Sequence, residues 1–254
     1  MNARTLLPLT LLVFGCAARA KGPTIVAPQP QAASIAPRPP SIDHRTRERA
    51  IPEVKIAWPV FTLDDEQASA VVNDAIAKAL HREEDSFVSQ YGEARRQGNA
   101  DLPEATLQWT LELDCRESLV TESIVSVWCS EYAYTGGAHG MSEGSAFNFA
   151  IAGSETRTLQ LNELLRDGAR PQLADACIED LKEQEASYAL DGTLTTANVS
   201  DLLDAFRIEK SGLIFYFAPY ATGCYAEGSR EVTLTWAELA PLARPGGVLD
   251  RMMR

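Results

Sequence analysis

The best candidates for chemistry in this 254-residue chain lie in residues 134–140, which read Tyr-Thr-Gly-Gly-Ala-His-Gly. His139 is one of only three histidines, and imidazole titrates close enough to neutral pH to act as a general base or a metal ligand. Gly136, Gly137 and Gly140 permit backbone torsions that a Cβ forbids. The stretch predicts either a catalytic loop or a tight connection between two strands. We favour the connection, with His139 hydrogen-bonded to the loop and fixing its shape.

Residues 140–144 also match G-x-S-x-G, the pattern that places a nucleophilic serine between a strand and a helix. Here the following segment, residues 147–151, has the composition of a strand. In hydrolases of this type the catalytic histidine follows the serine, whereas the last histidine of this chain, His139, precedes Ser142. The sequence therefore argues against a serine-hydrolase triad, and no catalytic residue is assigned.

Metal and cofactor sites are not predicted either. His44, His81 and His139 are widely spaced, and the chain contains neither a C-x-x-C nor an H-x-x-x-H pair. The glycines do not form the G-x-x-x-x-G-K-[ST] loop that cradles phosphates. We therefore expect no metal and no cofactor.

A second candidate region is the aromatic, glycine-punctuated stretch at residues 217–228, between two expected strands. Tyr220 and Tyr225 lie in it, and exposed tyrosines supply binding energy at a small entropic cost. Two interpretations stay open: a recognition surface, or a long turn whose tyrosines pack back onto the sheet.

The cysteines predict disulfide bonds. Four of the five follow the N-terminal region, at Cys115, Cys129, Cys177 and Cys224, and an even number in an exported chain indicates two bridges. Three pairings are possible. We favour Cys115–Cys129, which closes a hairpin-like segment, and Cys177–Cys224, which would pin a helix to a C-terminal loop.

Residues 1–15 have the features of an export signal, with Arg4 followed by a short apolar run. The run ends at Val-Phe-Gly-Cys16, which resembles the motif that marks bacterial lipoproteins, and we expect Cys16 to be lipidated. The alternatives are cleavage after Ala20, at an A-x-A pattern, and a cysteine that merely belongs to the apolar run. No other segment is long and apolar enough to span a bilayer.

Residues 16–52 predict a disordered, proline-rich tether. Seven of the 14 prolines fall between Pro23 and Pro52, and such a composition favours extended backbone over a packed core. The expected role is to hold a domain away from a membrane surface.

The net charge is −12, and cleavage of the signal, which removes Arg4, makes it more negative by one. A chain this acidic disfavours nucleic acids and anionic lipid headgroups as partners. It favours a cationic partner, although acidity also serves solubility.

The folded part is predicted to be α+β, with antiparallel sheets, packed helices and two closely associated subdomains at residues 53–152 and 153–243, followed by a tail at 244–254. Strands are expected from alternation and composition, and helices from apolar periodicity and end signals. The expected strands are 54–61, 107–114, 118–134, 147–151, 212–217 and 231–235. A long helix is expected to begin near 62–66 and to run past 87, and shorter helices are expected to begin near 159, 171, 202 and 236.

Several of these motifs occur together in a known family. Besides Tyr134 and the rest of residues 134–140, they include Phe-Asn-Phe at 147–149, Leu-Gln-Leu-Asn-Glu-Leu at 159–164, the strand at 212–217, the loop at 219–228 and the segment at 231–239. With them the chain resembles the extracellular domain of unknown function shared by RsiV-type anti-sigma factors and PdaC-type envelope deacetylases.

The resemblance implies a two-part α+β module, with a PdaC-like half at residues 53–152 and an RsiV-like half at 153–243. In RsiV-type proteins the module faces outward and binds lysozyme, a strongly basic protein, which an acidic module suits. The sequence lacks a transmembrane helix, a sigma-binding segment and a polysaccharide-deacetylase domain, so signalling and deacetylation are not carried over.

We therefore expect a non-enzymatic lipoprotein of the cell envelope that binds a protein such as a lysozyme, or a cell-wall component. The anchor would place it on the periplasmic side, and Ala17 after Cys16 favours the outer membrane. The alternative location is soluble, in the periplasm or outside the cell. Alternative functions are a wall hydrolase or deacetylase centred on His139, and a purely structural envelope protein.

Overall fold

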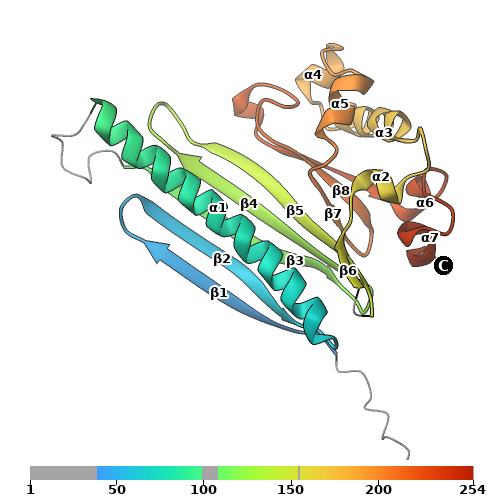
Figure 1. Ribbon diagram of the computed structural model, residues 1–254. Coiled ribbons are helices and arrows are strands. Elements are labelled where there is room, and N and C mark those ends of the chain that lie inside the picture. Colours follow the sequence, from blue (N-terminus) through green and yellow to red (C-terminus); the bar gives the residue numbers. More distant parts are fainter. Residues whose placement is uncertain (1–38, 99–107, 154, 254) are drawn as a thin grey trace, which may run out of the picture. The chain divides into compact units, whose positions relative to one another are not determined.

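The computed structural model describes residues 39–98, 108–153 and 155–253, which form two sheets and their helices (Figure 1). A six-stranded sheet has the order β1-β2-β3-β4-β5-β6 and a three-stranded sheet the order β7-β8-β9. The predicted α+β class is confirmed. The strands are β1 Ser41–Arg49, β2 Glu53–Thr62, β3 Thr110–Val120, β4 Ile124–Tyr134, β5 Met141–Ala152, β6 Glu155–Thr158, β7 Phe206–Ile208, β8 Gly212–Phe217 and β9 Arg230–Thr235. The helices are α1 Glu66–Gly98, α2 Leu161–Leu164, α3 Arg170–Glu183, α4 Ser187–Leu190, α5 Thr196–Leu202, α6 Trp236–Leu239 and α7 Val248–Met252.

The predicted antiparallel pairing has one exception, because β2 and β3 run parallel, with Glu53 opposite Thr110. The cause is α1, which joins these strands. A long helical crossover returns the chain to the end of the sheet from which β2 started, and the next strand then runs in the same direction. The other strand pairs of both sheets are antiparallel.

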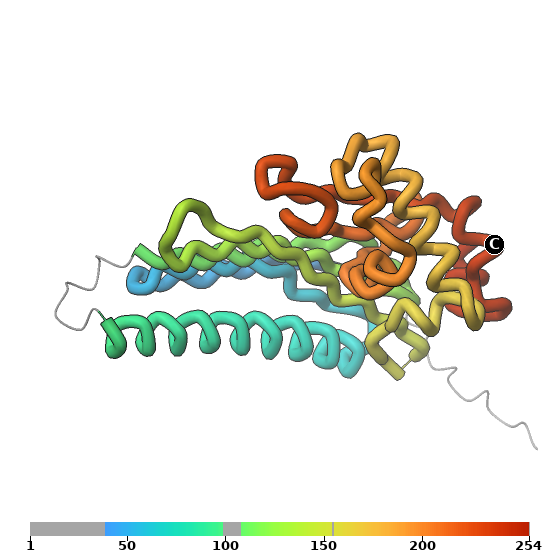
Figure 2. Tube along the Cα trace, turned by 90° about the horizontal axis from the view of Figure 1, so that it is seen from above, coloured from blue at the N-terminus to red at the C-terminus, as the bar shows by residue number. Residues whose placement is uncertain are grey.

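Helix α1 covers one face of the large sheet, as Figure 2 shows. Its buried side chains recur at helical spacing, for example Val72, Ile76 and Leu80, and they pack against the strand residues Val54 and Leu111. The helix is capped at its start by Asp65, whose Oδ1 accepts the backbone N–H of Ala68 at 2.8 Å.

The opposite face of the large sheet meets the small sheet through buried polar groups. Strand alternation turns Val125 and Val127 of β4 toward α1, and Ser126 between them toward β7. Ser126 Oγ donates to Asn148 Oδ1 at 2.7 Å and accepts the backbone N–H of Ile208 at 2.9 Å, while Asn148 Nδ2 donates to the carbonyl of Phe206 at 2.9 Å. Each of these buried groups therefore has a hydrogen-bond partner, which removes most of the cost of burying it.

A second apolar core lies around the small sheet. It includes Leu173 and Leu181 of α3 and Phe215 of β8. It also includes Leu249 of α7, which is fully buried. The prediction of a tail over residues 244–254 is therefore wrong for 248–252, because this segment forms a helix with a core residue.

The predicted tether extends too far. Residues 41–49 form β1, which pairs with β2 over nine residues, from Ser41 opposite Thr62 to Arg49 opposite Val54. No proline interrupts this segment, so its N–H groups can join the sheet despite their charged side chains. The rest of the predicted tether, the signal and Cys16 lie outside the described residues. Among the described residues, no helix is both long and apolar enough to cross a bilayer.

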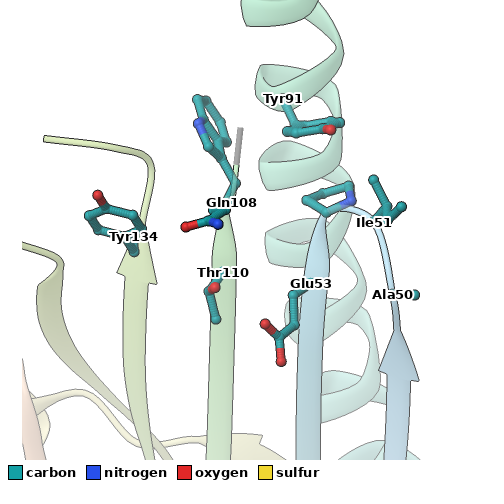
Figure 3. A pocket seen from close by; sticks show the side chains of 9 residues that line it. Ala50, Ile51, Glu53, Tyr91, Gln108, Thr110 and Tyr134 are labelled. Carbon is teal, nitrogen blue, oxygen red and sulfur yellow. The ribbon is translucent and has the colours of Figure 1, made fainter. Parts of the chain in front are cut away.

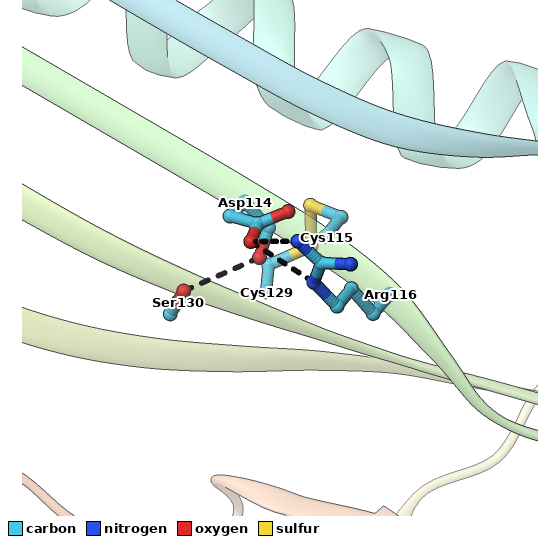
Figure 4. The surroundings of a disulfide bond; sticks show 5 residues. All are labelled: Asp114, Cys115, Arg116, Cys129 and Ser130. Carbon is cyan, nitrogen blue, oxygen red and sulfur yellow. Dashed lines mark hydrogen bonds and ion pairs between the residues drawn. A yellow bond between two sulfur atoms is a disulfide. The ribbon is translucent and has the colours of Figure 1, made fainter. Parts of the chain in front are cut away.

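One predicted disulfide is confirmed and the other is wrong. Cys115 of β3 and Cys129 of β4 lie directly opposite each other and are bonded (Figure 4). Cys177 and Cys224 are both free thiols. Cys177 is on the core side of α3 and fully buried, and burial raises the pKa of its thiol to about 12, whereas Cys224 is exposed in the β8–β9 connection.

Candidate functional site

Three ring side chains from distant parts of the chain meet on the surface. His139 comes from the loop between β4 and β5, and Tyr220 and Tyr225 come from the connection between β8 and β9. The ring of His139 stacks on that of Tyr225, with centroids 3.6 Å apart and planes 18° apart. Tyr220 completes the group, 5.6 Å from Tyr225 and 6.4 Å from His139. We call these three residues the His–Tyr cluster.

Hydrogen bonds fix the cluster to the backbone of the hairpin loop. The hydroxyl of Tyr225 donates to the carbonyl of Gly140 at 2.8 Å, and His139 Nδ1 lies 3.0 Å from the same oxygen. Because a carbonyl oxygen only accepts, Nδ1 must carry a proton. In the neutral imidazole Nε2 is then an acceptor, and the Tyr220 hydroxyl lies 3.4 Å from it. The prediction that His139 bonds the loop is thus confirmed. However, its ring is on the surface rather than inside the loop.

The hairpin loop depends on three glycines for two reasons. Gly136 and Gly137 have φ values of +101° and +97°, which L side chains rarely adopt. Gly140 is buried, and a Cβ there would lie 2.5 Å from the ring of Tyr132. Tyr134 braces the loop, since its hydroxyl donates to the carbonyl of Gly137 at 3.1 Å.

The β8–β9 connection presents Tyr220 in an unusual way. Tyr220 has a φ of +71°, in the left-handed region that bulky residues avoid, and 49% of its surface is exposed. Such a conformation costs of the order of 1–3 kcal/mol and persists only where the surroundings impose it.

A partly buried carboxylate holds the later part of the same connection. Glu227 accepts hydrogen bonds from the hydroxyl of Ser187 at 2.6 Å, the backbone N–H groups of Ser187 and Cys224 at 3.2 Å, and Arg230 at 3.1 Å. These donors, above all Ser187, lower the pKa of Glu227 to about 2. A Cβ on Gly223 would lie 2.3 Å from this carboxylate, so only glycine leaves room for it.

A second electrostatic feature lies in β4, close to the loop that joins β4 and β5. Glu131 stands directly opposite Glu143 of β5. Burial, reinforced by the carboxylates of Glu83 and Glu143, raises the pKa of Glu131 to about 7. The proton on this group is therefore exchanged close to neutral pH.

The residues with catalytic potential are kept apart. Ser142 lies inside β5 opposite Tyr132, in a strand and not at a strand-to-helix turn. His44 lies on β1, where its ring is 3.1 Å from Glu117, and His81 lies on α1. Within residues 39–98, 108–153 and 155–253, no three His, Cys, Asp or Glu side chains are grouped so as to hold a metal ion.

The structure therefore unites some of the predicted site residues and separates others. His139, Tyr220 and Tyr225 meet, whereas Tyr134 lines a different hollow at the end of the sheet. The sequence interpretation missed Glu227, whose partner Ser187 is 40 residues away along the chain. Its only local signal is the glycine four positions earlier.

Two family models match the sequence. The one described as Deacetylase PdaC matches residues 46–142, and the one described as Protein of unknown function (DUF3298) matches residues 162–237. His139 falls in the first match, and Tyr220 and Tyr225 fall in the second. No curated protein matches the chain.

Solved structures match most of the chain. The crystal structure of a DUF3298-family member from Bacteroides fragilis covers 84% of this chain and 97% of its own, with a TM-score of 0.63 and 17% identity. The structure of a DUF3298-family protein from Pseudomonas aeruginosa covers 82% of this chain and 96% of its own, with a TM-score of 0.52 and 14% identity. At these identities the likeness establishes the fold.

Proposed function

The chain joins a PdaC domain to a DUF3298 domain, and we propose that this combination is a ligand-binding module rather than an enzyme. The observation that carries the proposal is the exposed ring of Tyr220 in a left-handed backbone conformation. The ring contacts Tyr225 and His139, yet about half of the surface of Tyr220 stays exposed. The strained backbone orients a large aromatic group toward solvent, as expected of a binding hot spot.

The construction of the His–Tyr cluster supports the same proposal. Both ring nitrogens of His139 are engaged, Nδ1 with the carbonyl of Gly140 and Nε2 with the hydroxyl of Tyr220. With Nδ1 protonated, only Nε2 can accept a proton, and its neighbour is the Tyr220 hydroxyl at 3.4 Å. The imidazole here instead serves as a flat surface against Tyr225, and each domain contributes rings to one patch.

The proposed ligand is a protein or a cell-wall component, with a lysozyme-like protein as the first candidate. The net charge of −12 favours a basic partner and would accelerate its association at low salt. The resemblance to RsiV-type proteins suggests the same class. The proposed setting is the cell envelope, behind a lipid anchor at Cys16, and mass spectrometry of the mature N-terminus tests that part separately.

Calorimetric titration of the mature protein with a basic lysozyme, at low and moderate salt, tests the ligand. We expect Tyr220→Ala to weaken binding by roughly tenfold or more, because an exposed aromatic anchor is lost. Leu202→Ala is the matched control, since Leu202 is also an exposed apolar side chain but lies on α5.

The outcomes separate the parts of the proposal. If Tyr220→Ala keeps its melting temperature and binds as well as the wild type, the His–Tyr cluster is not the binding site. If no lysozyme binds even at low salt, the lysozyme candidate is excluded, and co-sedimentation with purified wall sacculi then tests the cell-wall alternative.

A further inference from the structure

A cavity of about 430 Å³ lies at the end of the large sheet, apart from the His–Tyr cluster. It is formed by the β1–β2 turn, the later part of α1, the start of β3 and the end of β4. Figure 3 shows Tyr91 on the helix, Glu53 on β2, Gln108 and Thr110 at the start of β3, and Tyr134 on β4 around this opening. Four elements thus contribute side chains to one cavity.

The aromatic part of the wall is held rigidly. Trp109 lines the cavity and packs edge-on against Tyr91, with centroids 5.7 Å apart and planes 71° apart. Its ring also lies 5.6 Å from that of Phe87. Tyr91 and Phe87 are buried in the contact between α1 and the sheet, so the indole is supported from behind. Trp109 is only half-buried, so part of its ring remains available for stacking.

The remaining wall offers hydrogen-bonding groups of both kinds. The side-chain amide of Gln108 donates and accepts, and the carboxylate of Glu53 accepts. Glu53 is ion-paired with Lys55 at 2.8 Å, and its pKa is lowered mainly by that lysine, so it is charged at neutral pH. A ligand that fills this cavity therefore needs a flat apolar face and several hydroxyl or amide groups at its edge, as a sugar ring has.

A second hollow of about 410 Å³ adjoins the cavity and shares Ile51, Pro52 and Tyr91 with it. Arg49, Arg95 and Arg96 line this hollow. Arginines in the last turn of α1 are explained by the dipole of the helix, but Arg49 comes from β1. Its Nε donates to the carbonyl of Ile51 at 3.0 Å, which holds the guanidinium beside the turn.

We propose that the two hollows form one binding site for an acidic saccharide. The sugar ring would stack in the aromatic cavity, with its hydroxyls on Glu53 and Gln108, and a carboxylate on the saccharide would pair with Arg49 and Arg96. Guanidinium groups recognise carboxylates through paired hydrogen bonds. The arginines that line the second hollow form a locally positive region on a chain whose net charge is −12. The negative charge of Glu53 makes the aromatic cavity unsuitable for a second carboxylate, so a polyanion fits less well.

Calorimetric or NMR titration of the mature protein tests the site with a matched pair of probes. The first is a disaccharide with one uronic acid and one neutral sugar, and the second is its methyl ester. They differ only in the negative charge and the ester methyl. We expect the acid to bind at least tenfold more tightly than the ester. A triglutamate peptide, which has carboxylates without a sugar ring, is expected to bind more weakly than the acid.

Variants locate the site. Arg49→Gln with Arg96→Gln should abolish the preference for the acid over the ester, whereas Arg45→Gln, a charge change on the same strand outside the hollow, should preserve it. Gln108→Ala, at an exposed residue, should weaken both probes without a change in melting temperature. Tyr220→Ala should leave saccharide binding intact, which separates this site from the His–Tyr cluster.

Four results would overturn the proposal. The first is equal binding of the acid and the ester, and the second is binding of triglutamate as tight as that of the acid. The third is an equal loss of the preference for the acid in the double variant and in Arg45→Gln. The fourth is no detectable binding of the acid at millimolar concentration.

Discussion

Two loops meet at the His–Tyr cluster, and they obtain their shapes by different means. The β4–β5 loop relies on backbone freedom: Gly136 and Gly137 have positive φ values. The β8–β9 connection instead places Tyr220, a bulky residue, at positive φ, and the carboxylate of Glu227 holds the later part of this connection through the backbone N–H of Cys224. The first loop is formed by residues that tolerate the conformation, whereas the second is held by side-chain contacts. Substitutions should therefore affect the second loop more strongly, and over a longer range.

The largest effect is expected from Gly223→Ala. The new methyl group would lie 2.3 Å from the carboxylate carbon of Glu227, so either the loop or the carboxylate must move. We expect a loss of about 2–3 kcal/mol, from overpacking and from hydrogen bonds to Glu227 that are broken. Thermal unfolding should show a fall in melting temperature of roughly 5–10 °C.

The control for this substitution is Gly98→Ala, at the end of α1, where a Cβ would have no neighbour within 4 Å. It should leave the melting temperature nearly unchanged. Equal stability of Gly223→Ala and the wild type would show that Glu227 does not determine the loop.

A smaller effect with a distinct pH dependence is expected from Glu227→Gln. The amide oxygen can still accept from Ser187, but the charge opposite Arg230 is lost. The pKa of Glu227 is lowered from 4.5 to about 2 in the folded protein, so the unfolded state takes up a proton first as the pH falls. The stabilisation by the carboxylate is therefore present above pH 4.5 and is lost as the pH falls to about 2.

Urea denaturation at several pH values measures this loss. The wild type should exceed Glu227→Gln in unfolding free energy at pH 7, and the gap should narrow below pH 4.5 and close as the pH reaches about 2. A gap that stays constant from pH 7 to pH 2 would contradict the assignment of the charge to this carboxylate.

In the first loop, Gly137→Ala should cost about 1–2 kcal/mol, because an L residue at a φ of +97° is strained. Nothing lies within 4 Å of a Cβ at Gly137, so the cost is purely conformational. Gly137→Asn is the informative comparison, since asparagine tolerates positive φ better and should recover part of the loss. If alanine and asparagine lower the melting temperature equally, steric contact rather than backbone conformation controls this position.

Close to the same loop, Glu131→Gln should stabilise the protein by about 1 kcal/mol at pH 8, a value reduced to allow for the partial exposure of Glu131. The folded pKa of Glu131 is raised to about 7, so the unfolded state ionises first as the pH rises. The contribution of Glu131 to stability is therefore most favourable below pH 4.5 and falls between pH 4.5 and 7. Chemical denaturation should show the gain of the variant at pH 8 and no gain at pH 4.5. An equal gain at pH 8 and at pH 4.5 would mean that the gain comes from the strand propensity of glutamine and not from the loss of the charge.

The contrast between the loops also explains what could be predicted from the sequence. Alternation and turn composition were sufficient for β8, predicted at 212–217 and observed as Gly212–Phe217. They missed β1, because its charged residues carry no apolar pattern and an edge strand is held largely by its backbone bonds to β2. The glycines of residues 134–140 marked a tight connection through local torsions, which a local pattern can reveal.

Longer-range features escaped prediction for physical reasons. Ser187 and Glu227 are joined by tertiary contacts that leave no local trace. The error at Cys177 was avoidable, because Leu173, Cys177 and Leu181 share one face of α3 at helical spacing, which indicates a core position. For the site, the sequence named the rings of the His–Tyr cluster but could not show that His139 stacks on Tyr225, since two domains supply them.

The smallest effect on stability is expected from His139→Phe, which distinguishes a flat surface from a chemical group. Phenylalanine retains a ring that can stack on Tyr225. It loses the hydrogen bond from Nδ1 to Gly140, whose carbonyl still accepts from Tyr225, and the longer 3.4 Å contact of Nε2 with the exposed hydroxyl of Tyr220. The loss should be within about 0.5–1 kcal/mol, the usual net value of one hydrogen bond.

If the cluster is a binding surface, His139→Phe should bind the ligand nearly as well as the wild type, and His139→Ala should not. If His139 is instead a catalytic base, turnover of wall fragments by the wild type should disappear in both variants alike. Because phenylalanine preserves the flat surface and removes both ring nitrogens, activity that survives in His139→Ala but not in His139→Phe would contradict both explanations.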